Sequence, residues 1–199
     1  MLMEDLRKAG ERLTGLARPT PRQAKALVRP RKANSFHFRD DGLVPNNPHW
    51  PALHYRGAVA LDDDFDPAAI FEVLFAAHGW RDGWRDQVYD YLHYHSDQHE
   101  VLGFARGHAV LRLGGARGRT LKVKAGDVLV LPAGTGHQRF SMSRDLLVVG
   151  GYPRKGGYDI CHPNKADHDR ASGAIAKVPR PRADPAYGAE GPLTRLWRT

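Results

Sequence analysis

The chain is poor in cysteine, with Cys161 alone among 199 residues. One thiol cannot form an intrachain disulfide, which is typical of proteins that fold in a reducing compartment. Long hydrophobic runs are missing too. No stretch of about 18 apolar residues occurs, so no membrane-spanning helix is expected, and the N-terminus lacks the apolar centre of a secretory signal. We therefore expect a cytoplasmic protein with no membrane partner.

Acidic residues are scarce only at the N-terminal end. Residues 1–32 hold nine Lys and Arg against three acidic residues, whereas residues 33–199 hold 21 basic and 19 acidic residues. A basic arm can neutralise phosphates, but this one has no interleaved aromatics and no recognised nucleic-acid module. We interpret residues 1–33 as a basic, flexible N-terminal extension and expect no nucleic-acid partner.

The remaining sequence has the pattern of an all-β domain. Short strand-like runs follow one another, with turn sequences rich in glycine at 114–118 and 124–127 between them, which is typical of a sandwich or a barrel. No internal repeat is present, so we expect one barrel. The strand-like runs cover residues 35–39, 53–61, 89–95, 100–106, 109–113, 120–123, 128–131, 138–142 and 146–149.

Two helices are expected beside these strands. Asp66 followed by Pro67 is a helix start, because a carboxylate caps the free N–H groups and proline suits the first helical turn. An apolar stripe follows, and Gly79 ends the helix. A second, short C-terminal helix is expected over residues 166–177. The proline-rich segment from Pro179 onward is expected to wrap around the domain surface.

Three histidines and one glutamate form a candidate metal site. His93 and His95 lie two residues apart, so in a strand both side chains point to one face. Glu100 can return on the adjacent strand, and His137 belongs to a later strand that must pass close by. Neutral imidazole and carboxylate suit one divalent transition metal ion, which can be Fe, Mn, Ni, Co or Zn.

Two motifs in this sequence resemble those of the cupin superfamily. The first has the form G-x5-HxH-x3,4-E-x6-G, and the second has the form G-x5-PxG-x2-H-x3-N. The positions that fit are His93, His95, Glu100 and Gly107 in the first motif, and Gly126, Pro132, Gly134 and His137 in the second. Gln87 replaces the first glycine and Ser141 replaces the final asparagine. Neither departure falls on a position that ligates the metal in cupins.

The resemblance extends beyond the motifs to a family of small bacterial single-cupin proteins. It rests on PNNP at 45–48, HGW at 78–80 and DPAYGAEGPL at 184–193. It implies a double-stranded β-helix, a jelly-roll-like small barrel, over residues 34–199, with the ion inside the barrel. It also implies a homodimer. The alternative is a cupin that keeps the barrel without a metal, but all four ligand positions are filled here.

Other residues are candidates for the pocket around the ion. Arg139 alternates with His137, so its guanidinium can bind a substrate carboxylate or phosphate; the alternative is a solvated strand-end arginine. Phe104 shares its face with Glu100 and is either a pocket wall or plain core. Gln98 is a candidate for contacting substrate or orienting a ligand. Tyr91 is a candidate proton donor, and Glu100 can move a proton as well as bind the ion.

Three functions are compatible with this pattern. A metal-dependent enzyme would act on a small molecule, by dioxygenase-type chemistry or by isomerase or decarboxylase chemistry with the ion as a Lewis acid. A second possibility is a non-catalytic module that binds or senses a small molecule. A third is a structural cupin with an incidental metal. The ligand set favours a metal-dependent enzyme, because binding alone does not require an ion with free coordination positions. The substrate does not follow from the fold.

Overall fold

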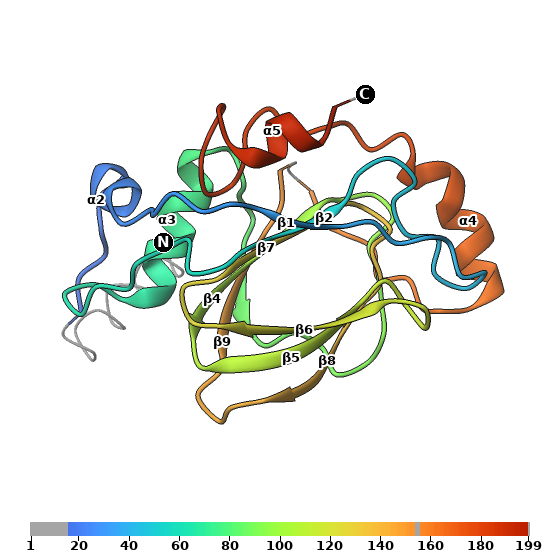
Figure 1. Ribbon diagram of the computed structural model, residues 1–199, viewed down its shortest axis with the longest axis horizontal. Helices are drawn as coiled ribbons and strands as arrows, with labels where there is room; N and C mark the ends of the chain where they lie inside the picture. The colour runs from blue at the N-terminus through green and yellow to red at the C-terminus, as the bar shows by residue number, and fades with distance from the viewer. Residues whose placement is uncertain (1–15, 154–155, 199) are drawn as a thin grey trace.

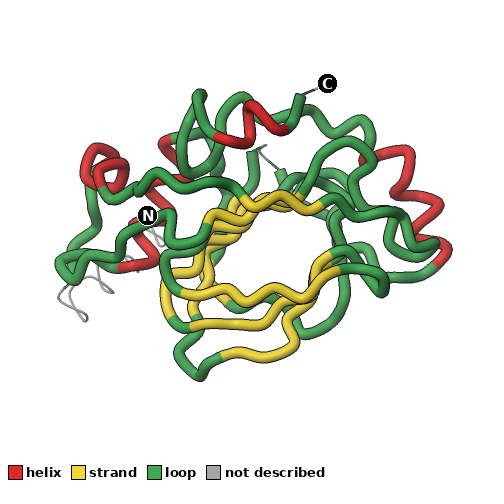
Figure 2. The backbone as a smooth tube through the Cα atoms, viewed as in Figure 1, coloured by secondary structure: helices red, strands yellow, loops and turns green. Residues whose placement is uncertain are grey.

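The computed structural model describes residues 16–153 and 156–198. Two antiparallel sheets face each other and enclose a barrel (Figures 1 and 2). One sheet has the strand order β1-β2-β7-β4-β9-β3, and the other has the order β6-β5-β8. The predicted all-β, jelly-roll-like barrel is confirmed. The strands are β1 (Asn34–Phe36), β2 (Ala52–Tyr55), β3 (Arg85–Asp86), β4 (Glu100–Arg106), β5 (His108–Leu113), β6 (Arg119–Lys124), β7 (Val128–Leu131), β8 (His137–Met142) and β9 (Leu147–Gly151).

Strand β4 shows how the sequence divides its side chains between two cores. Val101 and Ala105 belong to the core under the helices, while Leu102 and Phe104 belong to the core between the two sheets. This alternation follows from the two-residue period of a strand. Glu100 has the same parity as Leu102 and therefore faces the barrel interior.

The predicted helix before the motifs is α3 (Pro67–Ala77), and Asp66 caps it by accepting a hydrogen bond from the Ala68 N–H at 3.1 Å. The predicted C-terminal helix is α4 (Lys165–Ile175). Two short helices, α2 (Pro21–Ala26) and α5 (Pro192–Leu196), were not expected from the sequence. Among the described residues, no helix has both the length and the apolar character needed to cross a membrane.

Helices and terminal segments cover the outer face of the larger sheet. α3 packs against β4 and β9, and α5 lies over the same sheet, at the top of Figure 1. The C-terminal segment carries Trp197, which is fully buried and stacks on Trp50 with ring centroids 5.3 Å apart. In this view, none of the helices formed by the described residues lies over the smaller sheet (Figure 1).

Part of the expected basic extension packs on the domain. Ala24 of α2 is fully buried in the core under the helices, and Val28 forms an isolated bridge with Val59. The described part of the expected extension therefore packs against the domain through Ala24 and Val28. Residues 1–15, which carry the rest of the predicted flexible extension, lie outside the described residues.

The prediction of a strand over residues 89–95 is wrong. This segment is irregular and makes only isolated bridges, between His93 and His137 and between Tyr94 and Cys161. The strand predicted over 53–61 is shorter, because a turn at Gly57, with φ of 56°, follows β2. The turn predicted at 124–127 is present, and its Gly126 has φ of 90°, a left-handed conformation that favours glycine.

Candidate metal centre

The three histidines of the two motifs meet inside the barrel. His93 and His137 exchange backbone hydrogen bonds, from His93 N to His137 O at 3.2 Å and from His137 N to His93 O at 2.9 Å. His95 lies beside them, and one ring nitrogen from each of the three lies within 4.8 Å of the others. All three side chains are buried. The structure therefore brings together His93, His95 and His137 as the sequence predicted.

Each of the three imidazoles is oriented by a hydrogen bond between its Nδ1 atom and a backbone carbonyl. The Nδ1 atom of His93 lies 3.1 Å from the Tyr91 carbonyl, and that of His137 lies 3.0 Å from the Thr135 carbonyl. The Nδ1 of His95 bonds to the Asp159 carbonyl. A carbonyl only accepts, so each Nδ1 must carry the proton and each neutral ring keeps a lone pair on Nε2. This is the arrangement by which proteins orient metal-ligating histidines.

Glu100 completes the donor set from the start of β4. Its Oε2 lies 3.3 Å from His137 Nε2 and 3.7 Å from His95 Nε2. Its Oε1 accepts a hydrogen bond from the Tyr152 hydroxyl at 2.9 Å. Burial would raise the pKa of Glu100, but His95, His137 and the Tyr152 hydroxyl lower it to about 2. The Tyr152 hydroxyl thus donates to one carboxylate oxygen and leaves the other, Oε2, facing the histidines.

In this arrangement the Nε2 lone pairs of the histidines face the lone pairs of the Glu100 carboxylate oxygen Oε2. Glu100 Oε2 is buried and has no hydrogen-bond partner, although two Nε2 atoms lie nearby. Burial, with the neighbouring His137, lowers the pKa of His93 to about 3, which disfavours an imidazolium here. A buried acceptor without a donor is costly, and a cation among these four donors removes that cost. The residues present therefore fit a metal ion, and the donor set of imidazole and carboxylate suits a transition metal.

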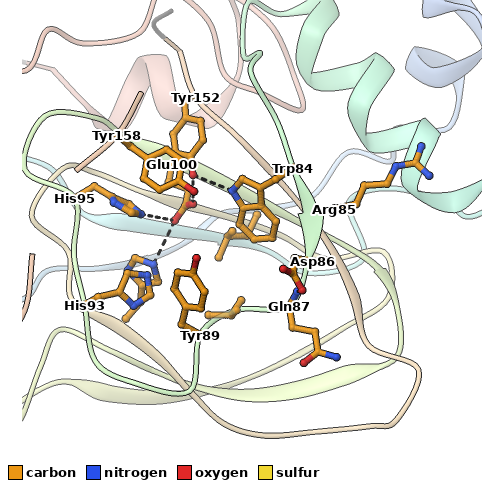
Figure 3. A pocket seen from close by; sticks show the side chains of 13 residues that line it. Trp84, Arg85, Asp86, Gln87, Tyr89, His93, His95, Glu100, Tyr152 and Tyr158 are labelled. Carbon is orange, nitrogen blue, oxygen red and sulfur yellow. Dashed lines mark hydrogen bonds and ion pairs between the residues drawn. The ribbon is translucent and has the colours of Figure 1, made fainter. Parts of the chain in front are cut away.

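A cavity of about 130 Å³ opens beside these donors. Figure 3 shows Trp84 and Tyr152 on its walls near Glu100, and Tyr89 with its hydroxyl directed into the space beside His93. Tyr158 stacks on Tyr152 with ring centroids 4.7 Å apart. Small size and aromatic walls favour a small ligand, since pockets for drug-sized ligands measure about 300–1,000 Å³.

The other candidate residues are not among those that line this cavity. Arg139 donates from Nε to the Val88 carbonyl at 2.8 Å, and its Nη2 lies 3.9 Å from Asp90 Oδ2. Phe104 is fully buried in the core between the sheets. Gln98 is buried, and its side-chain oxygen has no hydrogen-bond partner. Tyr91 is 40% exposed and stacks on Tyr89 at 4.8 Å.

Sequence reasoning missed the residues that support the ligands. Trp84 donates from Nε1 to the Tyr152 hydroxyl at 2.8 Å, so Trp84, Tyr152 and Glu100 form one chain of hydrogen bonds. Asp159, whose carbonyl orients His95, is fixed by Ser96, whose N–H and hydroxyl both donate to its carboxylate, at 2.7 and 2.5 Å. No motif marks these residues, because their roles depend on how distant segments pair.

Comparison with known proteins identifies one close relative by sequence. It is described as uncharacterized protein YjlB, from Bacillus subtilis (strain 168), and is 36% identical over 167 residues, which cover 84% of this chain and 98% of that protein. No model of a known protein family matches the chain.

Solved structures with a related arrangement are more distant. Acireductone dioxygenase from Bacillus anthracis, with a cadmium ion in its active centre, is 16% identical over 54% of this chain and 80% of that chain, with a TM-score of 0.38. WlaRA, a TDP-fucose-3,4-ketoisomerase from Campylobacter jejuni, is 11% identical over 48% and 77%, with a TM-score of 0.37. Procruciferin from Brassica napus gives 16% identity and a TM-score of 0.33, over 39% of this chain and only 21% of procruciferin. At such scores, no inference about activity follows.

Proposed function

This chain belongs to the family of the Bacillus subtilis protein YjlB, and from the geometry of its barrel site we propose that it is a metal-dependent enzyme acting on a small molecule. One observation supports this most strongly. Three Nε2 lone pairs and an unpartnered carboxylate oxygen converge at the inner end of a cavity. Four donors are fewer than the six that many divalent ions accept, which leaves room for substrate on the cavity side.

His93, His95, Glu100 and His137 would hold the ion in this proposal. A bound ion would supply a Lewis acid that polarises a substrate oxygen and, if it is redox-active, a site for oxygen chemistry. The reaction class is accordingly of the dioxygenase type or of the isomerase or decarboxylase type. Which of these applies depends on the metal and on the substrate.

The protein's own side chains have distinct tasks. The rings of Trp84, Tyr152 and Tyr158 restrict water around the donors and orient a small ligand. Glu100 can accept a proton at Oε2, because Oε1 is already engaged with Tyr152. The hydroxyl of Tyr89 points into the cavity (Figure 3) and replaces Tyr91 as the candidate proton donor. A cytoplasmic location and a homodimer complete the proposal on the strength of the family resemblance.

The experiment begins with the metal content of the purified protein. We expect about one Fe, Mn, Ni, Co or Zn per chain, and loss of that metal in His95→Ala. His108→Ala is the matched control, because His108 is an exposed histidine on β5, away from the cavity. A wild-type protein that can be reconstituted with none of these metals would contradict the site assignment.

Turnover then separates an enzyme from a binding module. Oxygen consumption and product formation are measured for a panel of small oxo-acids, thiols and phenolics, with wild type and Glu100→Gln side by side. Turnover that requires both the metal and the Glu100 carboxylate supports the enzyme. Tight binding of a compound with no turnover in any metal form would instead indicate the non-catalytic binding or sensing module.

A further inference from the structure

The side chains that line the cavity include one arginine, and that arginine is turned away from it. Arg85 donates to both carboxylate oxygens of Glu72, at 2.7 and 3.0 Å, and to Asp66 at 2.7 Å. Figure 3 shows the Arg85 side chain extending away from the histidines toward the neighbouring helix. Apart from the three histidines, no other basic residue lines the cavity among the described residues.

The acidic side chains of the cavity also disfavour a ligand with several negative charges. Glu100 lies beside the histidines, and Asp86 also lines the cavity. A divalent ion beside one carboxylate and neutral imidazoles leaves a net charge of about +1. That charge compensates one negative charge on a ligand. A second negative charge would be desolvated without a partner, which is costly in a partly enclosed site.

Aromatic rings provide most of the remaining wall. Trp84, Tyr89, Tyr152 and Tyr158 line the cavity together with the apolar side chains of Val88 and Leu102. Tyr152 and Tyr158 stack on each other, with 26° between their planes, so each ring supports the other. Aromatic and apolar walls favour a flat ligand with an apolar edge, since ring stacking adds to the area buried.

From these observations we propose that the site selects a small, flat chelator with at most one negative charge and an apolar or aromatic edge, and that it discriminates against dicarboxylates and phosphates. The inference rests on the proposed function for the presence of the ion. Selection within this substrate class then depends on the lack of a free cation among the described residues of the cavity lining and on the aromatic walls.

Ligand binding to the Co²⁺-loaded protein tests this class without any turnover. Tropolone and oxalate are suitable probes, because both are flat and chelate through two oxygens, but tropolone carries one charge and an apolar ring while oxalate carries two charges. Each dissociation constant is measured from the visible Co²⁺ spectrum. We expect the preference for tropolone over oxalate to exceed that of free Co²⁺ by at least about tenfold, a margin in keeping with one poorly compensated charge.

A variant that restores a cation sharpens the test. Gln87→Arg places a guanidinium on the cavity lining, and we expect it to tighten oxalate binding about threefold, as for an exposed ion pair, with tropolone unchanged. Thr120→Arg is the control, because it adds the same charge on exposed β6, away from the cavity. It should leave both constants unchanged.

The outcomes separate this inference from the proposed function. If Co²⁺ binds at the site but the protein prefers tropolone over oxalate no more than free Co²⁺ does, only the proposed substrate class is overturned. An unchanged oxalate affinity in Gln87→Arg would also count against it. Failure of Co²⁺ to bind at all would overturn both the metal-dependent function and the inference built on it.

Discussion

At the scale of single residues, the centre depends on how each donor is held in place. Each histidine is fixed through its Nδ1 by a backbone carbonyl, whereas Glu100 is fixed by a side chain, the Tyr152 hydroxyl. Burial, together with the charge of Glu100, raises the pKa of Tyr152, so this hydroxyl keeps its proton and remains a donor. Because Tyr152 occupies Oε1, only Oε2 of Glu100 faces the histidines.

Tyr152→Phe removes this donor while conserving ring size. We expect the dissociation constant for Co²⁺ or Mn²⁺ to rise about tenfold, which is typical for loss of a group that orients a ligand. Metal titration measures this directly. Tyr187→Phe is the matched control, because the Tyr187 hydroxyl donates to the Arg29 carbonyl far from the site. Equal affinities for Tyr152→Phe and wild type would show that the hydroxyl does not orient Glu100.

The candidate metal ligands could be predicted from the sequence, but the residues that hydrogen-bond to them could not. His93, His95 and Glu100 occur within one short segment, and His137 lies at a fixed spacing in a second motif. Tyr152 reaches Glu100 only because β9 pairs with β4, with Val101 opposite Gly151. Trp84 reaches Tyr152 because the Trp84 carbonyl accepts from Gly150 N at 3.0 Å. Such contacts depend on strand register, which no local pattern specifies.

At the scale of elements, α3 approaches β4 closely at one glycine. A Cβ atom added to Gly103 would lie 2.4 Å from Cδ1 of Phe71 and 2.9 Å from Cζ of Phe75. Both rings are fully or almost fully buried in the core under the helices, so neither can move aside freely. The absence of a side chain at Gly103 thus allows this close approach of α3 to β4.

Gly103→Ala should therefore destabilise the fold by about 1–3 kcal/mol, the usual cost of overpacking a core. Urea denaturation of the metal-free protein measures the difference. Gly173→Ala in α4 is the matched control, since an added Cβ there meets nothing within 4 Å. That change should stabilise by roughly 0.5–1 kcal/mol through helix propensity. Destabilisation of the same size in both variants would contradict the packing argument.

A second element-level contact joins α4 to the loop before β2. The Nε2 atom of His168 lies 2.9 Å from both carboxylate oxygens of Asp40, and Nδ1 lies 3.2 Å from Asp169. The hydrogen bond to Asp40, followed by that to Asp169, raises the pKa of His168. A histidine whose pKa is raised on folding contributes stability that is fully present below its unfolded value of about 6.5. This contribution is lost as the pH rises through the folded pKa.

The pH dependence of stability tests this contact. We expect wild type to be more stable than His168→Gln at pH 5.5, and the difference to shrink above neutral pH. Taking the difference between the two proteins cancels the other titrating groups, apart from Lys165, which binds Asp169 in the same cluster. Asp40→Asn should give the same profile. A difference that stays constant from pH 5.5 to 9 would exclude a charged His168 as its source.

Helices and strands could be predicted where a strong local signal marks them. The prediction failed where residues that serve the candidate site alternate in the way that strand residues do. Asp66 and Pro67 mark the start of α3 by capping chemistry, and the helix begins there. The helices α2 and α5 have 6 and 5 residues, too few for a periodic stripe to be recognised. Residues 89–95 alternate like a strand, but the alternation of His93 and His95 belongs to the metal site and the segment is irregular.

At the scale of the whole molecule, the candidate metal site takes residues from both sheets of the barrel. His137 begins β8 of the smaller sheet, and Glu100 begins β4 of the larger sheet, while His93 and His95 lie on the irregular segment that crosses between them. An ion held by all four residues would therefore link the two sheets. Such an ion binds only the folded chain, since the unfolded chain does not assemble the four donors, and it must stabilise the entire domain.

Metal binding should accordingly raise the stability of the domain in proportion to the logarithm of free metal. At a free metal concentration 100 times the dissociation constant, we expect about 2.7 kcal/mol of added unfolding free energy. For a domain of this size, this corresponds to a rise in Tm of about 5–10 °C. Calorimetry of the metal-free protein with increasing Co²⁺ or Mn²⁺ measures the slope. His137→Ala should abolish it and His108→Ala should preserve it, because His108 is an exposed histidine that does not line the cavity. A Tm that rises equally in both variants would place the stabilising metal elsewhere on the protein.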